Sequence, residues 1–303
     1  MMVDPTHQTL VSRRNGLADL APAYGAIFCD VWGVLHNGIA IYLEAAAALS
    51  QYRAQGGRVI MITNSPRPKA GVVEQLVQLG APDTVYDDIV TSGDVTRDLI
   101  RQADGAVYHI GPDRDLPLFA GLDVKLTAPD AAKAIVCTGL FADETEVPED
   151  YRSSFEPLVA RGLPFICANP DIVVERGDRL IWCAGALARL YEEMGGETRL
   201  AGKPHTPIYD LAMERLEAIS GETPIKANIL AIGDGMPTDV AGALNNGFPL
   251  LYISSGIHAA EYGDPDTPDP VRLQAFLDAH YAAPTATMPR LVWKRLDRDQ
   301  LSP

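Results

Sequence analysis

Short, continuously apolar runs alternate along the chain with longer segments of helical periodicity, and this alternation limits the fold more than any other feature. The clearest apolar run, Ala26-Ile27-Phe28-Cys29, ends at Asp30. A strand without polar positions is typical of a sheet covered on both faces, and strands that alternate with helices are typical of crossover connections. The sequence therefore predicts an α/β fold with a doubly wound parallel sheet.

Local signals place the boundaries of several elements. Gly56-Gly57 ends a predicted helix over 43–55, and Ser65-Pro66 fits the N-cap and first residue of a helix that ends near Gly80. Asn37-Gly38 between apolar pairs predicts a hairpin over 34–41. Further strands are predicted at 58–62, 89–91 and 228–232, and further helices end near 102, begin at 206 and run from 238 to 246.

The middle of the chain is predicted to be a second domain, inserted into the first. Its strands, at 107–110, 134–137 and 164–167, alternate with helices, but they do not end in polar clusters like those of the flanking regions. We therefore expect one domain from 1–103 and 198–303, and an inserted domain from 104–197. Asn169-Pro170-Asp171 lies within the insert and fits a simple turn as well as a functional segment.

Polar side chains gather where predicted elements of the outer domain begin or end. Because the carboxyl ends of parallel strands meet at one crevice of a doubly wound sheet, we expect these side chains to converge. The four clusters are Asp30; Thr63 with Asn64; Lys203; and Asp234 with Asp239. The crevice that they form is the predicted active site.

This set of residues suits phosphoryl transfer. A carboxylate such as Asp30 can attack phosphorus and form an aspartyl-phosphate. Nucleophile and phosphate are both anionic, so a divalent cation is needed, and Mg²⁺ prefers oxygen ligands such as Asp30 and Asp234. Thr63 offers a hydroxyl, and the residues after it offer backbone N–H groups, for the phosphoryl oxygens. Lys203 supplies a positive charge that can pair with nucleophile and phosphate.

Composition argues against several other classes of protein. A formal net charge of −15 over 303 residues disfavours nonspecific binding to nucleic acid, which depends on Lys and Arg. All apolar runs are shorter than the roughly 20 residues of a membrane span, and Met1-Met2-Val3-Asp4-Pro5 lacks the pattern of a signal peptide. Four scattered cysteines without a C-x-x-C pair favour buried, reduced thiols. We expect a cytoplasmic protein with no nucleic-acid partner and no membrane partner.

Taken together, these segments resemble subclass IIA of the haloacid dehalogenase (HAD) superfamily of hydrolases, the group of NagD-like sugar phosphatases and pyridoxal-phosphate phosphatase. The resemblance covers residues 24–258 and rests on four motifs in order. The motifs are Asp30-Val31-Trp32-Gly33-Val34-Leu35, Thr63-Asn64-Ser65, Gly202-Lys203-Pro204, and Gly233-Asp234 with Thr238-Asp239. Asn169-Pro170-Asp171 is similar to a segment of the cap in that subclass.

The resemblance implies a Rossmann-like core, an inserted α/β C2-type cap, Mg²⁺, and phosphate-ester chemistry on a small phosphorylated metabolite such as a sugar phosphate. The catalytic residues that it implies are Asp30, Thr63 and Lys203. The metal site that it implies consists of Asp30, Asp234, the main-chain carbonyl of Trp32, and Asp239, which would orient the water shell. A helix-capping role fits Asp239 as well. The expected substrate-binding positions are Gly33, Asn64 and Ser65, and a homodimer is left open as a partner.

One position departs from the family pattern. Phosphatases of this superfamily carry Asp two positions after the nucleophile, where it protonates the leaving oxygen and then activates water, whereas this chain has Trp32. An indole N–H has no titratable role near neutral pH, and general acid–base assistance is typically worth about 10²–10⁴ in rate. His36 is the nearest alternative in sequence, although an exposed hairpin histidine is the simpler interpretation. We expect a hydrolase with slow or altered turnover. The alternative is a non-hydrolytic phosphometabolite-binding or regulatory protein that retains the metal and phosphate site.

Overall fold

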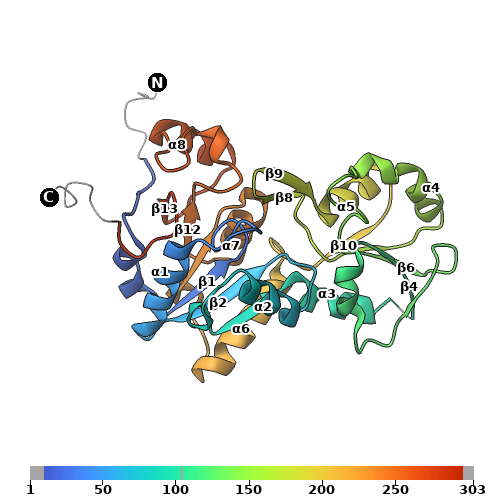
Figure 1. The fold of residues 1–303 in the computed structure, drawn as a ribbon, viewed down its shortest axis with the longest axis horizontal. Coiled ribbons are helices and arrows are strands. Elements are labelled where there is room, and N and C mark those ends of the chain that lie inside the picture. The colour runs from blue at the N-terminus through green and yellow to red at the C-terminus, as the bar shows by residue number, and fades with distance from the viewer. Residues whose placement is uncertain (1–9, 104, 296–303) are drawn as a thin grey trace, which may run out of the picture.

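The computed structural model describes residues 10–103 and 105–295, so the N-terminal segment Met1–Pro5 lies outside the described residues. The larger lobe is built on a six-stranded sheet in which every neighbouring pair is parallel (Figure 1). From edge to edge its strands are β13 (Ala286–Met288), β12 (Leu250–Ile253), β11 (Ile229–Gly233), β1 (Ala26–Asp30), β2 (Arg58–Thr63) and β3 (Asp88–Thr91). The predicted parallel sheet is confirmed, and β1 lies near its centre.

Helices cover both faces of this sheet. Successive residues of a strand point to opposite faces, so Ile27 and Cys29 pack into one layer and Phe28 into the other. The first layer contains α1 (Leu43–Ala54) and α2 (Lys69–Gln78). The second contains α3 (Ser92–Arg101), α6 (Thr206–Ser220), α7 (Ala241–Asn246) and α8 (Pro270–Ala279). Burial on both faces explains why β1 has no polar residue before Asp30, and the sheet is doubly wound as predicted.

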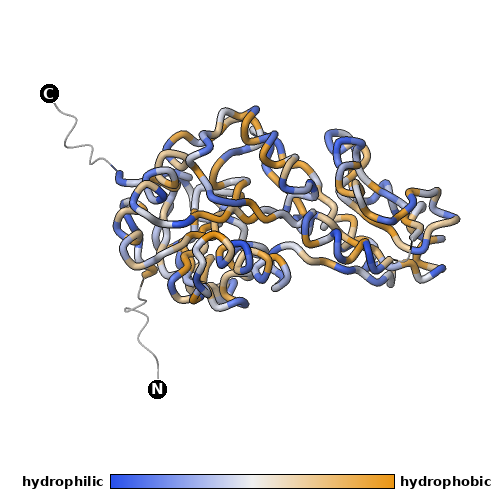
Figure 2. Tube along the Cα trace, turned by 90° about the horizontal axis from the view of Figure 1, so that it is seen from below, coloured by the Kyte–Doolittle hydropathy of each residue, from blue (hydrophilic) through white to orange (hydrophobic). Residues whose placement is uncertain are grey.

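The smaller lobe has a parallel sheet of its own, in the order β10-β7-β6-β4-β5. Its strands are β4 (Ala106–Ile110), β5 (Lys125–Leu126), β6 (Ala134–Cys137), β7 (Phe165–Cys167) and β10 (Thr198–Leu200). The helices α4 (Arg152–Ala160) and α5 (Ala184–Glu193) pack on it through an aromatic cluster around Phe155 and Tyr191. Figure 2 shows the two lobes from a second direction, with hydrophobic and hydrophilic segments alternating along the chain in both. We call the smaller lobe the cap.

A two-stranded antiparallel hairpin lies where the cap meets the larger lobe (Figure 1). It consists of β8 (Val173–Arg176) and β9 (Arg179–Trp182), joined by a turn in which Gly177 has a φ of +62°. We call residues 173–182 the cap hairpin. The sequence carries a signal for this hairpin, because Gly177-Asp178 between two runs of strand-forming residues is typical of a tight hairpin turn.

Three local predictions differ from the structure. The helix predicted from Ser65-Pro66 begins only at Lys69, because Pro66 and Pro68 each disfavour helical backbone in the residue before them. The helix predicted from Thr238 is preceded by a π-helical turn, Met236–Val240, before α7 begins. The hairpin predicted over 34–41 contains only isolated bridges. Its turn is held by the side chain of Asn37, whose Oδ1 accepts from the N–H groups of Ile39 and Ala40.

Short 3₁₀ turns connect the main elements. They lie at Leu17–Asp19, Ala21–Ala23, Asp83–Val85, Asp113–Phe119, Pro148–Tyr151, Lys226–Asn228 and Ala259–Glu261. All four cysteines are buried and free, as the sequence predicted. Within residues 10–103 and 105–295, no helix has both the length and the apolar character that crossing a membrane requires.

Candidate active site

Three carboxylates and one ammonium group meet at the carboxyl ends of β1 and β11, which are neighbours in the sheet. Asp30 is the last residue of β1, and Asp234 directly follows β11. The Nζ of Lys203 lies 2.5 Å from Oδ1 of Asp30 and 2.6 Å from Oδ1 of Asp239. All four side chains are buried. The structure therefore brings together residues that are up to 209 positions apart in the sequence, counted from Asp30 to Asp239.

Backbone groups fix two of these carboxylates. Asp234 accepts a hydrogen bond from the N–H of Ile257 at 3.0 Å, and Asp239 accepts one from the N–H of Gly235 at 3.0 Å. Gly33 has a φ of +89°, and a Cβ at this position would lie 2.5 Å from Oδ2 of Asp234. The turn after Asp30 therefore requires glycine both for its backbone conformation and for the space beside Asp234.

The segment after β2 forms the next wall of the site. The hydroxyl of Thr63 accepts from the N–H of Ser65 at 3.2 Å, which folds the chain back at the strand end. The side chain of Asn64 accepts from the N–H of Lys203 at 2.7 Å and donates to the carbonyl of Lys203 at 3.1 Å. It also donates to Oδ1 of Asp171 in the cap at 2.9 Å. The amide of Asn64 thus connects Lys203 to the cap, while substrate binding by Gly33, Asn64 and Ser65 stays a prediction.

The charges of the cluster do not balance. Asp30, Asp234 and Asp239 face the single ammonium group of Lys203, so the ionised site has a net charge of −2. Burial and then the neighbouring Asp239 raise the pKa of Asp234 to about 7, and the same two causes hold the pKa of Asp30 well above its usual value. Although burial opposes it, Asp239 and Asp30 raise the pKa of Lys203 well above its usual value.

The donor set fits a hard divalent cation. One oxygen from each of the three carboxylates can be chosen so that all lie within 4.8 Å of one another. Oxygen ligands and an uncompensated negative charge are what Mg²⁺ requires. Both oxygens of Asp239 already have partners, Lys203 and the N–H of Gly235, so Asp30 and Asp234 are the carboxylates with more freedom to hold a metal directly.

The side chain of Trp32 points toward the cap hairpin. Its Nε1–H donates to the carbonyl of Glu175, and its ring packs edge-on against His36 with the ring centroids 4.9 Å apart. A Cβ on Gly38 would lie 2.4 Å from the indole, so the turn formed by residues 36–41, which we call the flap, also packs closely against the ring. Whether the main-chain carbonyl of Trp32 holds a metal stays a prediction.

His36 lies elsewhere than the sequence suggested. Its side chain is buried rather than exposed, so the simpler interpretation of an exposed hairpin histidine is wrong. Its Nδ1 accepts from the N–H of Gly38 at 2.9 Å, and burial lowers its pKa to about 4. A ring nitrogen that accepts from the backbone, in a ring that stays neutral, supports the conformation of the flap.

Two cavities open at the boundary between the lobes. The larger, with a volume of about 370 Å³, is lined by Asp30, Lys203, Asp234 and Asp239, and its cap side is formed by the segment from Pro170 to Glu175. Its apolar lining residues include Ile172, Val173, Val174, Leu200 and Ile257. We call it the Asp30 cavity. Pockets of this size hold small molecules in many proteins.

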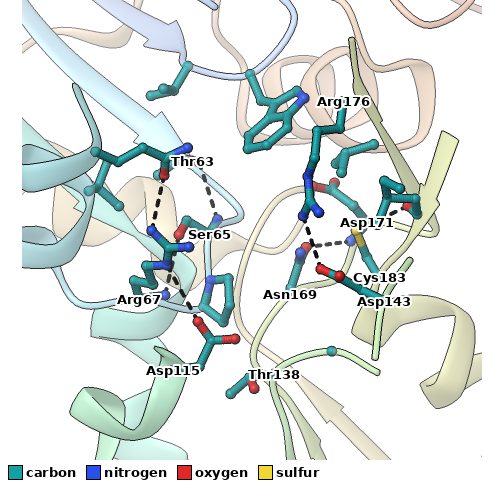
Figure 3. A pocket seen from close by; sticks show the side chains of 18 of the residues that line it. Thr63, Ser65, Arg67, Asp115, Thr138, Asp143, Asn169, Asp171, Arg176 and Cys183 are labelled. Carbon is teal, nitrogen blue, oxygen red and sulfur yellow. Dashed lines mark hydrogen bonds and ion pairs between the residues drawn. The ribbon is translucent and has the colours of Figure 1, made fainter. Parts of the chain in front are cut away.

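The second cavity, of about 90 Å³, is drawn in Figure 3, and it shares some of its lining residues, among them Trp32 and Asp171, with the Asp30 cavity. Figure 3 shows Arg67 of the larger lobe pointing toward Asp115 of the cap, and the two side chains approach to 3.5 Å. His36 lines this second cavity and is not among the residues described for the Asp30 cavity. His36 and the carboxylate cluster therefore line different cavities.

Comparisons with known proteins agree with this geometry. A family model described as haloacid dehalogenase-like hydrolase matches residues 27–125, and a HAD-hydrolase-like model matches residues 200–278. A solved hydrolase of the haloacid dehalogenase-like family from Brucella suis 1330 is 52% identical, with a TM-score of 0.84, and the match covers 92% of this chain and 100% of that chain. This chain belongs to the haloacid dehalogenase-like hydrolases.

More distant members share the architecture of this HAD-like hydrolase. A protein of Bacillus subtilis strain 168 named 5'-nucleotidase YutF is 25% identical over 82% of this chain and 93% of its own length. NagD from E. coli K-12 is 20% identical with a TM-score of 0.64, over 88% of this chain and 96% of that chain. The predicted resemblance to the HAD superfamily of hydrolases is confirmed, and the likeness to NagD shows a shared fold.

Sequence reasoning missed how the cap of this HAD-like hydrolase reaches the site. Asp171 contacts Asn64, and Glu175 contacts Trp32, although all these residues belong to segments far apart in the chain. Asn169-Pro170-Asp171 was recognised as a segment of interest, but no periodicity or spacing indicates which core side chain an inserted loop will meet. Its position directly before the cap hairpin was the available signal.

Proposed function

We propose that this HAD-like hydrolase is a Mg²⁺-dependent phosphatase of small phosphorylated metabolites, with Asp30 as its nucleophile. The observation that carries the proposal is the buried cluster of Asp30, Lys203, Asp234 and Asp239 at the end of a cavity of about 370 Å³. The name of the B. subtilis relative, a 5'-nucleotidase, supports a phosphate ester as the substrate class. The volume of the cavity favours a compact leaving group, and a sugar phosphate stays one candidate.

The proposed reaction has two halves. In the first, a carboxylate oxygen of Asp30 attacks phosphorus, the bond from phosphorus to the ester oxygen breaks, and an aspartyl-phosphate and an alcohol are formed. In the second, a water oxygen attacks the same phosphorus, which releases inorganic phosphate and the Asp30 carboxylate. Lys203, 2.5 Å from Asp30, orients the nucleophile, and the hydroxyl of Thr63 with the following N–H groups supports the phosphoryl oxygens.

The metal site that we propose is made by Asp30, Asp234 and the main-chain carbonyl of Trp32, with Asp239 orienting the water shell. When bound, Mg²⁺ would offset the negative charge that the carboxylates and the phosphate bring together. Asp239 holds Lys203 in the structure, so it contributes to the site through this contact as well.

We also propose that residues 104–197 act as a lid over the Asp30 cavity. The cap has its own sheet and hydrophobic cluster, and its segment from Pro170 to Glu175 covers the cavity. Closing such a lid over substrate excludes water and completes a site. In this proposal the lid opens to admit the phosphorylated metabolite.

One observation favours a second candidate, a non-hydrolytic protein that binds a phosphometabolite. The position two residues after Asp30 holds an indole whose N–H is already donated to Glu175, so this side chain has no proton to exchange with a leaving group. A screen of phosphate monoesters with Mg²⁺, including an activated aryl phosphate, separates the two candidates. Turnover of at least one ester supports the phosphatase, whereas binding of phosphate without turnover of any ester supports the second candidate.

The metal proposal predicts a weaker site in an Asp234→Asn variant. An amide oxygen carries no formal charge, so we expect the Kd for Mg²⁺, measured by calorimetry, to rise at least tenfold, which is about 1.4 kcal/mol. Asp266→Asn, a substitution of an exposed carboxylate that pairs with Arg290, is the control and should leave the Kd unchanged. An unchanged Kd in Asp234→Asn would contradict the assignment.

The raised pKa of Asp234 predicts how Mg²⁺ binding depends on pH. Between its usual pKa and its folded pKa of about 7, the folded metal-free protein holds a proton that the unfolded chain has released. The contribution of Asp234 to stability is therefore fully present at low pH and is lost as the pH rises toward 7. The ionised carboxylate of Asp234 would hold Mg²⁺ where the protonated one would not, so we expect saturating Mg²⁺ to raise Tm more at pH 8 than at pH 5. An equal rise at both values would contradict this prediction.

A further inference from the structure

An acid and base for the proposed reaction has to come from somewhere other than residue 32. The leaving alcohol needs a proton when the ester bond breaks, and the attacking water must lose one. The N–H of Trp32 is donated to the carbonyl of Glu175, and His36 lines the other cavity with its Nδ1 accepting from Gly38. The other titratable residues around the Asp30 cavity, outside the carboxylate cluster, are Asp171, Glu175, His205 and His258.

Contacts distinguish Asp171 from the others. Its Oδ1 accepts from Asn64 at 2.9 Å, and the same amide holds both backbone groups of Lys203, the partner of Asp30. The Nε2 of His258 is occupied, because it accepts from the N–H of Met236 at 3.1 Å. Through Asn64, hydrogen bonds therefore connect the carboxyl of Asp171 to the backbone of Lys203, which pairs with the nucleophile Asp30.

We propose that Asp171 of the cap is the general acid and base of this site, and that Trp32 is a positioning residue that holds the cap segment bearing Asp171. This inference rests on the proposed phosphatase function. Asp171 would donate its proton to the leaving oxygen while Asp30 attacks phosphorus. Its carboxylate would then take a proton from the water that attacks the aspartyl-phosphate, which returns Asp171 to its starting state and gives alcohol and inorganic phosphate.

The environment of Asp171 favours the protonated form of its carboxyl relative to an exposed aspartate. Burial raises its pKa, attraction by Lys203 and the hydrogen bond from Asn64 oppose this, and repulsion by Asp239 adds to it, so that the net shift is upward. Its backbone N–H donates to Oδ1 of Asn169 at 3.1 Å, which fixes the turn on which it sits. Asp171 lines both the Asp30 cavity, where substrate would lie, and the second cavity, which Figure 3 shows.

Trp32 fixes the segment that directly follows Asp171. Its indole donates to Glu175 in β8, a strand that begins two residues after Asp171. A second contact joins the same parts, since the N–H of Gly177 donates to the carbonyl of Asn37 at 3.2 Å. A Cβ on Gly177 would lie 2.5 Å from Cδ1 of Ile39, so the flap and the turn of the cap hairpin approach each other closely.

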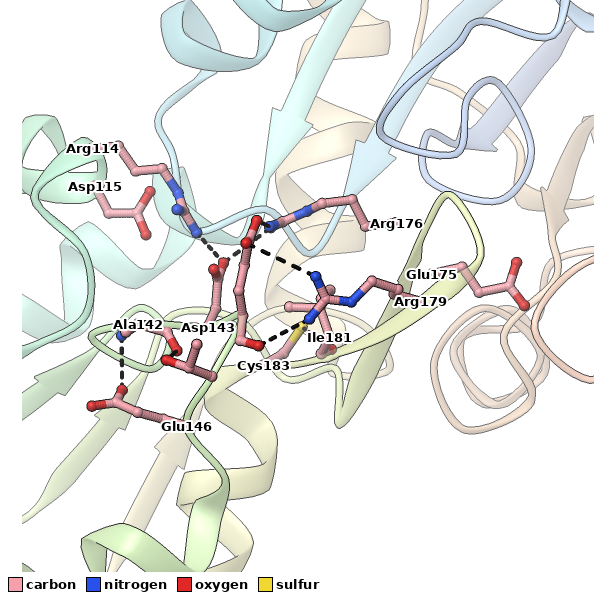
Figure 4. A network of polar contacts seen from close by, with 12 residues as sticks. Arg114, Asp115, Ala142, Asp143, Glu146, Glu175, Arg176, Arg179, Ile181 and Cys183 are labelled. Carbon is pink, nitrogen blue, oxygen red and sulfur yellow. Dashed lines mark hydrogen bonds and ion pairs between the residues drawn. The ribbon is translucent and has the colours of Figure 1, made fainter.

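The cap hairpin is also braced inside the cap, which makes it able to carry Asp171 as a unit. Arg176 of β8 lies 3.0 Å from Oδ2 of Asp143, and Arg114 pairs with the same oxygen at 2.5 Å (Figure 4). Arg179 of β9 donates to the carbonyl of Glu144 at 2.9 Å. The cap hairpin is therefore bound to the rest of the cap. By contacting this hairpin, Trp32 also fixes the position of the neighbouring segment that holds Asp171.

The test uses the full chain with Mg²⁺ and a series of phosphate monoesters from 4-nitrophenyl phosphate through phenyl phosphate to simple alkyl phosphates. A poor leaving group needs the proton of an acid, whereas 4-nitrophenolate needs little help. We expect Asp171→Asn, which can still accept from Asn64, to lose about 10²-fold or more in kcat/KM on the poor leaving groups and only a few-fold on 4-nitrophenyl phosphate. Asp171→Ser, which also lacks an ionisable group, replaces it if the first variant does not fold.

Two further variants complete the design. Glu175→Gln keeps the carbonyl that Trp32 contacts and removes another carboxylate from the same cavity, so we expect its dependence on the leaving group to match that of the wild type. Trp32→Phe removes the indole N–H but keeps an aromatic ring, and we expect a smaller loss of about tenfold that again grows as the leaving group becomes poorer. A purely structural role of Trp32 would instead lower Tm and reduce the rates on all esters equally.

The outcomes separate this inference from the function on which it rests. If the wild type hydrolyses no ester of the series, the proposed phosphatase function fails. If the wild type is active and Asp171→Asn keeps the same dependence on the leaving group, the assignment of Asp171 is overturned. A leaving-group-dependent loss in Glu175→Gln instead of Asp171→Asn would overturn it as well and assign the role to Glu175.

Discussion

Replacing Asp30 by Asn is expected to abolish turnover while leaving the fold intact. An amide is not a nucleophile toward phosphorus, and removal of one member of a catalytic unit costs about 10⁴-fold or more in other hydrolases. The metal-free protein should be as stable as the wild type or more so, because the pKa of Asp30 is raised by burial and by Asp239, which means that folding disfavours its charged form. Urea denaturation and steady-state rates measure the two effects separately.

A direct readout accompanies the rates. Wild-type protein quenched with acid during turnover of an activated aryl phosphate should carry a phosphoryl group on the peptide that contains Asp30, and Asp30→Asn should carry none. Asp19→Asn, a change at a surface carboxylate in the first 3₁₀ turn, is the control and should keep the label and the rate. Label on another residue, or turnover in Asp30→Asn within tenfold of the wild type, would show that Asp30 is not the nucleophile.

Replacing Lys203 by Met is expected to cause the largest loss of stability. The variant keeps a side chain of similar length but leaves Asp30 and Asp239 buried without the cation that lies 2.5 and 2.6 Å from them. Removing one partner of a buried ion pair typically costs about 3–5 kcal/mol. The free energy of unfolding without Mg²⁺, measured in urea, should fall by an amount of this order.

Two comparisons make the result specific. Lys69→Met removes the partner of Asp88, but the side chain of Lys69 is 45% exposed, so the loss should stay within about 1 kcal/mol. Saturating Mg²⁺ should raise the Tm of Lys203→Met more than that of the wild type, because the variant presents three carboxylates without an internal cation. A loss in Lys203→Met no larger than in Lys69→Met would refute the view that Lys203 balances this cluster.

The sequence predicted the fold well because burial on both faces leaves a clear mark. The run Ala26–Cys29 has no polar position since α1 and α2 cover one face of β1, and α6 and α7 cover the other. The start of α2 was predicted too early because Ser65-Pro66 has the residue types of a helix start, while Pro68 disfavours helical backbone for the residue before it. A neighbouring residue can override a single-residue signal for a helix start, whereas a pattern of buried residues repeated along a strand is not overridden in this way.

The candidate site was predictable only in part. Asp30 and Thr63 are the last residues of their strands and Asp234 directly follows its strand, and the topology of a doubly wound sheet brings strand ends together. The contacts made by the cap were not predictable, because Asn64 with Asp171 and Trp32 with Glu175 join segments that no shared strand pairing connects. The position of His36 was also missed, since nothing local indicates that a turn will be buried beneath the cap hairpin.

The two hydrogen bonds between the side chain of Asn64 and the backbone of Lys203 have a consequence for how such a protein can diversify. Lys203 stands directly after the inserted chain, yet a single amide, 139 positions earlier, sets its place by accepting from its N–H and donating to its carbonyl. The location of Lys203 is thus independent of the number of residues between Asn64 and Lys203. The free-energy cost of closing the loop that these residues form rises by only about 0.6 kcal/mol for each doubling of its length. Inserts of different size and lining can therefore be exchanged above the same chemical centre, so new substrates can be explored without rebuilding the nucleophile and its ammonium partner.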